Sequence, residues 1–271
     1  MALPFFYITS YTPGQQEIML DEDNSRHVIQ VLRMRPGEAL RLTDGKGALL
    51  DAVILDDHKK KCRVTIKTAA AEPPRTNKVT IAISPVKNAT RFEWFLEKAT
   101  EIGVSTIIPL ICERTERQSI RTDRLRNILV SAMLQSQQAW LPTLAEPTPL
   151  AELLTQTATG QAYIAHLLDP PDSLPPDLKR ASFPAGPPAP LCLGRSSGCR
   201  TLSGFLPAAL GGSTTAGSPA SATILIGPEG DFTPKEVESA LMARFIPVSL
   251  GHNRLRTETA GIVAATLLCI Q

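Results

Sequence analysis

The feature that most constrains the fold is an alternation of apolar, β-type runs with amphipathic helical segments, which begins near residue 79. Residues 79–84 and 104–111 are such runs, and each precedes a segment whose apolar residues recur at helical spacing. Gly103 is placed to cap the first helix. An order of strand, helix, strand, helix predicts an α/β fold with a largely parallel sheet.

The same alternation returns near the C-terminus. Residues 223–226 and 246–250 are short apolar runs, and residues 258–269 are apolar on most faces of a helix, which predicts burial. Between the two runs, Thr233, Pro234 and Glu236 stand in the order of an N-cap, a first helical residue and a capping box. We therefore expect a helix over 233–243.

The first 72 residues have a different pattern. Residues 39–43 alternate apolar and polar side chains, 44–47 can form a turn, and 48–55 resume the apolar pattern. One helix is expected over 27–33, after an acidic segment that can cap it. We predict a small β-barrel or sheet domain over 1–72 and an α/β domain over 76–271, joined by a proline-containing linker.

Residues 170–222 interrupt the second domain. The segment is rich in proline, glycine and serine, so we expect a long mobile insertion rather than regular elements. Its two cysteines, Cys192 and Cys199, are most simply incidental.

Composition narrows the class of protein without naming it. The hydrophobic fraction of 43% permits a substantial core, and the net charge of +2 neither requires nor excludes a nucleic-acid partner. Five scattered cysteines fit a reducing compartment better than a disulfide framework. The first residues lack a secretory signal pattern, and no apolar run is long enough to span a bilayer. We expect a cytoplasmic protein without a membrane partner.

Two loops stand out because each follows a predicted strand and precedes a predicted helix: Gly227–Phe232 and Leu250–Ala260. Ligands of parallel α/β sheets bind outside the carboxyl ends of the strands. Taken alone, the first loop could be an ordinary turn, and the second could be a charged segment that caps its helix. The chain has no Walker A motif, no G-x-G-x-x-G motif and no metal-ligand cluster. The residues by themselves indicate an α/β protein with a ligand site at these loops.

Several longer strings resemble one family. ILIGPEGDFTPKEVESA at 224–240 and PVSLGHNRLRTETAGIVAATL at 247–267 are similar to the C-terminal signature of the RsmE family, uracil-N3 methyltransferases of 16S ribosomal RNA in the SPOUT superfamily. HVIQVLRMRPGEALRLTDGKG at 27–47 resembles that family's PUA-like RNA-binding domain, and FEWFLEKATEIGVSTIIPLICERT at 92–115 resembles the start of its catalytic domain.

The resemblance implies a fold and a cofactor. It implies an N-terminal PUA-like β-barrel, a SPOUT-type parallel sheet with a C-terminal trefoil knot, and S-adenosylmethionine held by the loops of the knot. The positions carried over for the cofactor are His166, Leu167, Ile226, Gly227, Pro228, Glu229, Gly230, Leu250, Gly251, Leu255, Arg256, Thr257, Thr259 and Ala260.

The resemblance also implies a reaction, methylation of uridine N3. The N3 proton must leave, or the resulting anion must be stabilised, before N3 can attack the methyl group. We expect the Arg256 guanidinium to stabilise charge on the uracil oxygens. Glu258 would orient that arginine or accept a proton, although both residues could instead only shape the knot.

The implied partner is 16S ribosomal RNA in the assembled small subunit, bound by a homodimer without a metal ion. Basic residues in both domains are candidates for phosphate contacts. They are Arg26, Arg33, Arg35, Lys87, Arg91, Lys98 and Arg114. Two other functions stay open: a SPOUT enzyme that methylates a ribose 2′-hydroxyl or transfer RNA, and a non-catalytic RNA-binding factor in ribosome assembly.

The chain departs from the family pattern at three places. Residues 134–142, LQSQQAWLP, lack the glutamate, glycine and arginine that the family often shows there, and Asp231 replaces a common glycine. The insertion at 170–222 is the third departure. These differences bear on the RNA contacts more than on the cofactor site.

Overall fold

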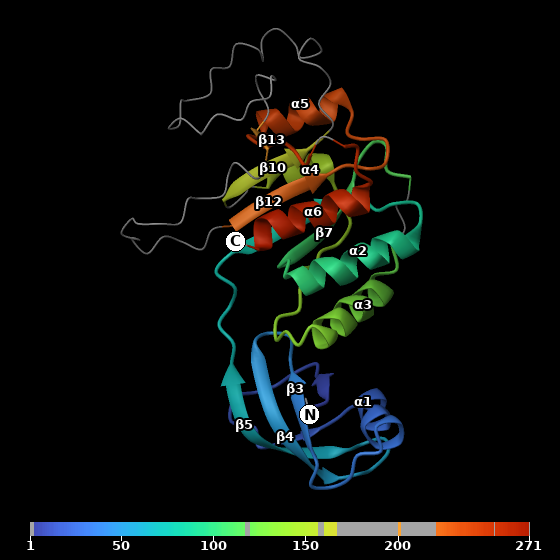
Figure 1. The fold of residues 1–271 in the computed structure, drawn as a ribbon, viewed down its shortest axis with the longest axis vertical. Helices are drawn as coiled ribbons and strands as arrows, with labels where there is room; N and C mark the ends of the chain where they lie inside the picture. Colours follow the sequence, from blue (N-terminus) through green and yellow to red (C-terminus); the bar gives the residue numbers. More distant parts are fainter. Residues whose placement is uncertain are drawn as a thin grey trace, which may run out of the picture. The chain divides into compact units, whose positions relative to one another are not determined.

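The computed structural model describes residues 3–116, 120–156, 160–166, 200–201, 221–251 and 253–270. These residues form two compact units, Met1–Thr76 with Thr122–Pro142 and Asn77–Arg121 with Thr143–Gln271. Figure 1 shows the helices and strands of each unit. No helix in the described part of the chain is both long enough and apolar enough to cross a membrane.

The first unit is built on a five-stranded sheet with the order β1-β3-β4-β5-β2. β1 runs parallel to β3, and the other pairings are antiparallel. The strands are β1 (Phe5–Tyr7), β2 (Glu17–Met19), β3 (Ala39–Thr43), β4 (Ala48–Asp56) and β5 (Arg63–Ala71). Burial alternates along β4, which is the pattern of a sheet with one face on a core.

The helical segment of this unit begins earlier than we predicted. α1 (Glu22–Arg26) has Asp21 as its N-cap, whose carboxylate accepts a hydrogen bond from the Asn24 amide at 2.8 Å. A π-helical turn over His27–Val31 follows directly. Asp21 is therefore the cap and the rest of the acidic segment is helix, since the Asp21 side chain satisfies one of the free amides of the first turn.

One predicted helix belongs to the other unit. α3 (Thr122–Gln135) was expected within the α/β domain, but it groups with the first unit. The residues after it explain this: Ala139 accepts a hydrogen bond from the Gly47 amide at 2.9 Å, and the Leu141 amide donates to Gly45 at 2.9 Å. The Trp140 ring lies where a Cβ on Gly47 would be, 2.6 Å from its Cζ2. The local periodicity of a helix does not reveal which core it joins.

The second unit contains an eight-stranded sheet with the order β11-β13-β10-β12-β6-β7-β8, and β9 also pairs with β7. All of these pairings are parallel, as predicted. The strands are β6 (Lys78–Ile83), β7 (Thr106–Ile111), β8 (Thr143–Leu144), β9 (Thr148–Pro149), β10 (Gln161–Ala165), β11 (Arg200–Thr201), β12 (Ser221–Ile226) and β13 (Ile246–Ser249).

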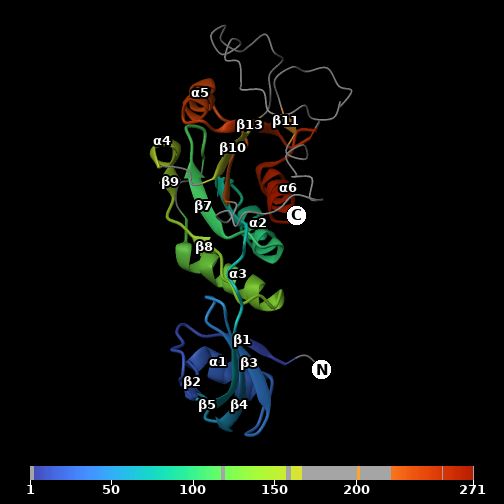
Figure 2. The same ribbon diagram turned by 90° about the vertical axis from the view of Figure 1, so that its left-hand side faces the viewer.

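Helices cover both faces of this sheet (Figure 2). α2 (Ala89–Ile102) and α6 (Thr257–Cys269) pack side by side on one face, and α4 (Leu150–Thr155) and α5 (Pro234–Met242) pack on the other. Gly261 of α6 permits the first pairing, because a Cβ there would lie 2.6 Å from the Phe95 ring and 2.8 Å from Ile83. The predicted capping box of α5 and the left-handed cap at Gly103 are both present.

The order of the central strands positions the site. β12 lies between β10 and β6, so the chain from β12 through α5 must cross over β10 to reach β13. The carboxyl ends of β10, β12 and β13 are therefore neighbours, although far apart in the sequence. Ligands of such sheets bind where the strand order changes in this way. Most of the predicted insertion at 170–222 lies outside the described residues.

Candidate active site

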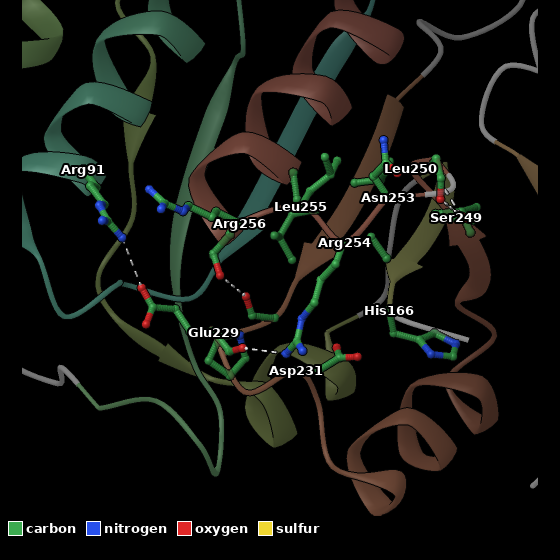
Figure 3. A pocket seen from close by; sticks show the side chains of 18 residues that line it. Arg91, His166, Glu229, Asp231, Ser249, Leu250, Asn253, Arg254, Leu255 and Arg256 are labelled. Atoms are coloured by element: carbon green, nitrogen blue, oxygen red, sulfur yellow. Dashed lines mark hydrogen bonds and ion pairs between the residues drawn. The ribbon is translucent and has the colours of Figure 1, made fainter. Parts of the chain in front are cut away.

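A pocket of about 530 Å³ opens at the carboxyl ends of β10, β12 and β13 (Figure 3). This volume is within the usual range for small-molecule sites. Both loops singled out in the sequence contribute to its walls. The residues that line it are Arg91, Ala165, His166, Ile226, Gly227, Pro228, Glu229, Asp231, Val248, Ser249, Leu250, Gly251, Asn253, Arg254, Leu255, Arg256, Thr257 and Ala260.

The loop after β12 is a tight turn. The Asp231 amide donates to the Pro228 carbonyl at 2.9 Å, and Asp231 adopts a left-handed conformation with φ of 61°. Aspartate tolerates this region better than most residues, since its short side chain can bond locally. Here its Oδ1 accepts from the Phe232 amide at 2.8 Å. The change from the family's glycine is thus compatible with the turn.

The loop between β13 and α6 is tied to the first loop. The buried Thr257 hydroxyl donates to the Gly227 carbonyl at 3.1 Å, which joins the start of α6 to the end of β12. Arg254 makes a longer contact, 3.5 Å, with the Glu229 carbonyl. Gly251 has φ of 140°, a backbone conformation that glycine adopts without strain. Two segments distant in sequence therefore form one continuous wall.

Arg91, in the first turn of α2, stands between two carboxylates. Its Nη1 lies 3.8 Å from Glu229 Oε1, and its Nε lies 3.8 Å from Glu258 Oε1. The Glu258 side chain is only 8% exposed, and its Oε2 is buried without a hydrogen-bond partner among the described residues. Burying a carboxylate is costly unless a cation compensates it, which Arg91 does. Glu258 is therefore behind Arg91 rather than in the pocket lining.

Arg256 is exposed and lines the pocket. In Figure 3 its guanidinium points toward Arg91 and away from Arg254. Arg256 is also the N-cap residue of α6, where its side chain makes no capping hydrogen bond. The guanidinium is thus not used to cap the helix, and it lies on the side of the pocket that Arg91 lines.

Most of the predicted cofactor positions come together in this pocket. Gly230 and Thr259 do not line it, and Thr259 is exposed on α6. Leu167 lies outside the described residues. The prediction missed neighbours of the same loops and strand ends: Ala165, Asp231, Val248, Ser249, Asn253 and Arg254. Arg91 was assigned to RNA alone, because nothing in the local sequence links α2 to loops more than a hundred residues away.

The basic residues proposed for RNA do not form one group. In the second unit, Lys87 pairs with Glu116 at 3.3 Å, and Lys98 pairs with both Glu97 and Glu101. The hydrogen bonds that the Lys98 ammonium group donates to these two carboxylates raise the pKa of Lys98. Arg114 donates to the Gly230 carbonyl at 2.6 Å.

In the first unit, Arg26 pairs with Glu22 at 2.8 Å. Arg33 and Arg35 are exposed and form no ion pair within the described part of the chain. Arg33 also has a positive φ of 56°, which is uncommon for a side-chain-bearing residue. These two arginines are the ones left available for a partner.

Cys62 and Cys112 are not candidate nucleophiles, and the described residues contain no metal cluster. Burial raises the pKa of Cys112 to about 12 and that of Cys62 to about 11, so both thiols stay protonated near neutral pH. No group of three or more potential metal ligands occurs where side chains are described.

Comparison with known proteins gives the family. Residues 72–180 and 206–269 match the RNA methyltransferase domain, and residues 20–67 match the RNA methyltransferase PUA domain. Ribosomal RNA small subunit methyltransferase E from Synechocystis is 30% identical over 241 residues, covering 88% of this chain and 68% of that protein.

Two solved structures share the fold over nearly their whole length. A probable rRNA methyltransferase from Porphyromonas gingivalis is 37% identical, covers 98% of both chains and has a TM-score of 0.77. A putative methyltransferase from Legionella pneumophila, solved with the bound cofactor SAM, is 25% identical, covers 99% of this chain and 97% of that one, and has a TM-score of 0.75. The chain therefore belongs to the RNA methyltransferase family that includes ribosomal RNA small subunit methyltransferase E, as its sequence strings indicated.

Proposed function

We propose that the protein transfers the methyl group of S-adenosylmethionine to N3 of a uridine in 16S ribosomal RNA of the small subunit. The observation that carries the proposal is the pocket itself, in which the two family-signature loops meet at the ends of β10, β12 and β13. The match of the first unit to an RNA methyltransferase PUA domain supports an RNA substrate.

The pocket suits the chemistry of S-adenosylmethionine. Ile226, Leu250 and Leu255 supply apolar walls for an adenosine, and the nearby backbone offers amides and carbonyls to its polar edges. Arginines and carboxylates in the lining can meet the zwitterionic amino-acid end. The bound donor supplies an electrophilic methyl group on a sulfonium, so no metal ion is required.

Arg256 is proposed to act on the uracil. Arg256 is exposed and lines the pocket, so its guanidinium can donate two hydrogen bonds to a carbonyl oxygen as negative charge develops. Glu258 is buried and pairs with Arg91 rather than with Arg256, so we assign it to the positioning of Arg91 instead of to proton removal. Its location beneath Arg91 is what supports this assignment.

RNA binding is assigned chiefly to Arg33 and Arg35 in the first unit. Both are exposed, and neither is committed to an ion pair among the described residues. Exposed guanidinium groups without an ion-pair partner can bind phosphate oxygens, and they then position the RNA without reading its sequence. Lys98, by contrast, is held by two glutamates and is a poorer candidate.

We further infer a cytoplasmic homodimer and a knotted arrangement of the C-terminal loops. The crossing of the chain from β12 over β10 to β13 is compatible with a knot. α6 leaves Ile262, Val263 and Leu267 only half-buried, and Ile270 after it is 63% exposed. A second copy of the chain would remove this apolar surface from water.

The test is methylation of small ribosomal subunits that lack the modification, followed by mass spectrometry of the digested nucleosides. We expect 3-methyluridine. A methyl group on ribose, or on transfer RNA instead, would move the protein to another SPOUT activity. Absence of both methylation and S-adenosylmethionine binding would favour a non-catalytic RNA-binding factor.

A further inference from the structure

The segment that follows β7, residues 112–116, is connected to the segment from Ile226 to α5 at three points, two by direct hydrogen bonds and one through Ser84. We propose that this segment is a brace for the cofactor loop, and that Arg114 is a positioning residue for the methyl donor rather than an RNA ligand. The inference rests on the proposed function, and it assigns a role that neither the sequence strings nor the pocket lining reveals.

The first connection is at the start of the loop. The Ser84 amide donates to the carbonyl of Ile226 at 3.0 Å, and the Ser84 and Thr115 hydroxyls lie 2.8 Å apart. Thr115 Oγ1 also accepts from the Cys112 amide at 2.8 Å, so Thr115 is held both to its own segment and to Ser84. Ser84 is fully buried and Thr115 is 6% exposed, so water does not compete for these bonds.

The second connection is in the middle of the loop. Arg114 Nη1 donates to the Gly230 carbonyl at 2.6 Å, a short, charge-assisted bond. The aliphatic part of Arg114 lies over Gly230, since a Cβ there would be 3.3 Å from Arg114 Cδ. Gly230 does not line the pocket, but Glu229 and Asp231 on either side of it do. Arg114 therefore holds the turn from outside while its neighbours face the ligand.

The third connection is at the end of the loop. The Glu113 amide donates to Glu236 Oε1 at 2.8 Å, while Glu236 Oε2 accepts from the Thr233 amide at 2.8 Å. Glu236 is the glutamate of the α5 capping box, so both of its oxygens are engaged. The brace thus contacts the middle of the loop and the start of α5 directly, and it contacts the end of β12 through Ser84.

The two possible roles of Arg114 predict opposite results. As a brace, it organises the loop before the donor binds, so its loss weakens S-adenosylmethionine binding and leaves the affinity for RNA unchanged. If Arg114 were a phosphate ligand, its loss would weaken RNA binding and leave cofactor binding intact. The slope of log K for RNA against log salt concentration would also fall by about one. Arg114 is exposed, so its removal does not threaten the core.

The experiment is calorimetric titration of Arg114→Ala, Arg114→Lys and the wild-type protein with S-adenosylmethionine, together with the KM for small subunits at saturating cofactor. We expect Arg114→Ala to raise the Kd for the cofactor about five- to tenfold, the usual scale for one charged hydrogen bond at an exposed site. Arg114→Lys should recover part of this loss, and the KM for subunits should not change.

Lys235→Ala is the matched control, because Lys235 is an exposed cation of the same region, on α5. It should alter neither constant. An unchanged cofactor Kd in Arg114→Ala would overturn the proposal, as would a raised KM for subunits. Because cofactor binding is measured without turnover, a wild-type protein that binds the donor but forms no 3-methyluridine would count against the proposed function alone.

Discussion

The two sheets of this protein organise functional residues in different ways. In the first unit the strands are mostly antiparallel, and exposed side chains such as Arg33 and Arg35 lie on the segment that connects the π-helical turn to β3. In the second unit every pairing is parallel and helices cover both faces, which leaves the carboxyl ends of the strands as the natural place for a ligand. Residues from β10, β12, β13 and α2 converge there.

The two strand arrangements also differ in how well a sequence predicts which residues share a site. A parallel sheet gathers its loops at one edge, so positions predicted separately from two sequence strings meet in one pocket. The largely antiparallel sheet has no such edge, so its strand order does not gather the basic residues of the first unit around one ligand site. We expect substitutions in the second unit to alter stability, cofactor binding or turnover, and substitutions in the first unit to alter RNA binding.

The largest effect is expected where α6 packs against α2. Gly261→Val would place side-chain atoms within the space of Phe95 and Ile83, and overpacking of this kind costs about 2–3 kcal/mol. Urea unfolding should show this loss, and cofactor binding should fall with it. Thr259→Val, an exposed change on the same helix, should have little effect on stability. Equal stability of the two variants would mean that the fold does not depend on the close approach of α6 to Phe95 and Ile83 at Gly261.

The next effect concerns the chemical step. Arg256→Ala should lower kcat about 100-fold, the scale of losing a group that stabilises developing charge, with little change in the Kd for S-adenosylmethionine. Single-turnover methylation of small subunits and calorimetry measure the two quantities. A normal turnover rate together with normal cofactor binding would show that Arg256 only shapes the loop. Arg254→Ala is the neighbouring control, and its effect on turnover should be smaller.

A smaller effect is expected from the bond that joins the two loops. Thr257→Val keeps the shape of the side chain but leaves the buried Gly227 carbonyl without its donor, which costs about 1–2 kcal/mol. Thermal unfolding and the cofactor Kd should both register the loss. Thr257→Ser, which retains the hydroxyl, should recover most of it. No difference between valine and serine would exclude the hydrogen bond as a support of the pocket.

In the first unit the effect should fall on RNA alone. Arg33→Glu should weaken binding to small subunits about tenfold at moderate salt and leave the Kd for S-adenosylmethionine unchanged. Filter binding across a salt series measures it. Arg26→Ala should do less, because Arg26 is already paired with Glu22. A change in cofactor affinity in Arg33→Glu would contradict the assignment of RNA binding to the first unit and cofactor binding to the second.

The smallest effect is expected at Lys98. Its ammonium group is held by Glu97 and Glu101, so Lys98→Met should change RNA binding less than twofold, within the range of an ordinary surface substitution. The same filter-binding series provides the measurement. A loss as large as that of Arg33→Glu would show that the second unit also binds phosphates through α2.

The sequence by itself determined the local features of this protein. Residue periodicity predicted β6, β7, β12, α2 and α6, and the run of Thr233, Pro234 and Glu236 predicted the capped start of α5. These features depend on side chains within one or two turns of each other, so local rules suffice. The signature strings indicated the family and most of the residues that meet in the pocket.

Only the tertiary structure decided which distant residues share a site. It brought Arg91 between Glu229 and Glu258, placed Arg114 on Gly230, and grouped α3 with the first unit. Each of these contacts joins segments that are far apart in the sequence. The strand order brings them together in space, and no local sequence pattern predicts that proximity. The physical reason is that a charged side chain pairs with the group that folding brings within reach. Here the strand order places the carboxyl ends of β12, β6 and β7 side by side, which brings Arg91 and Arg114 to the loop after β12.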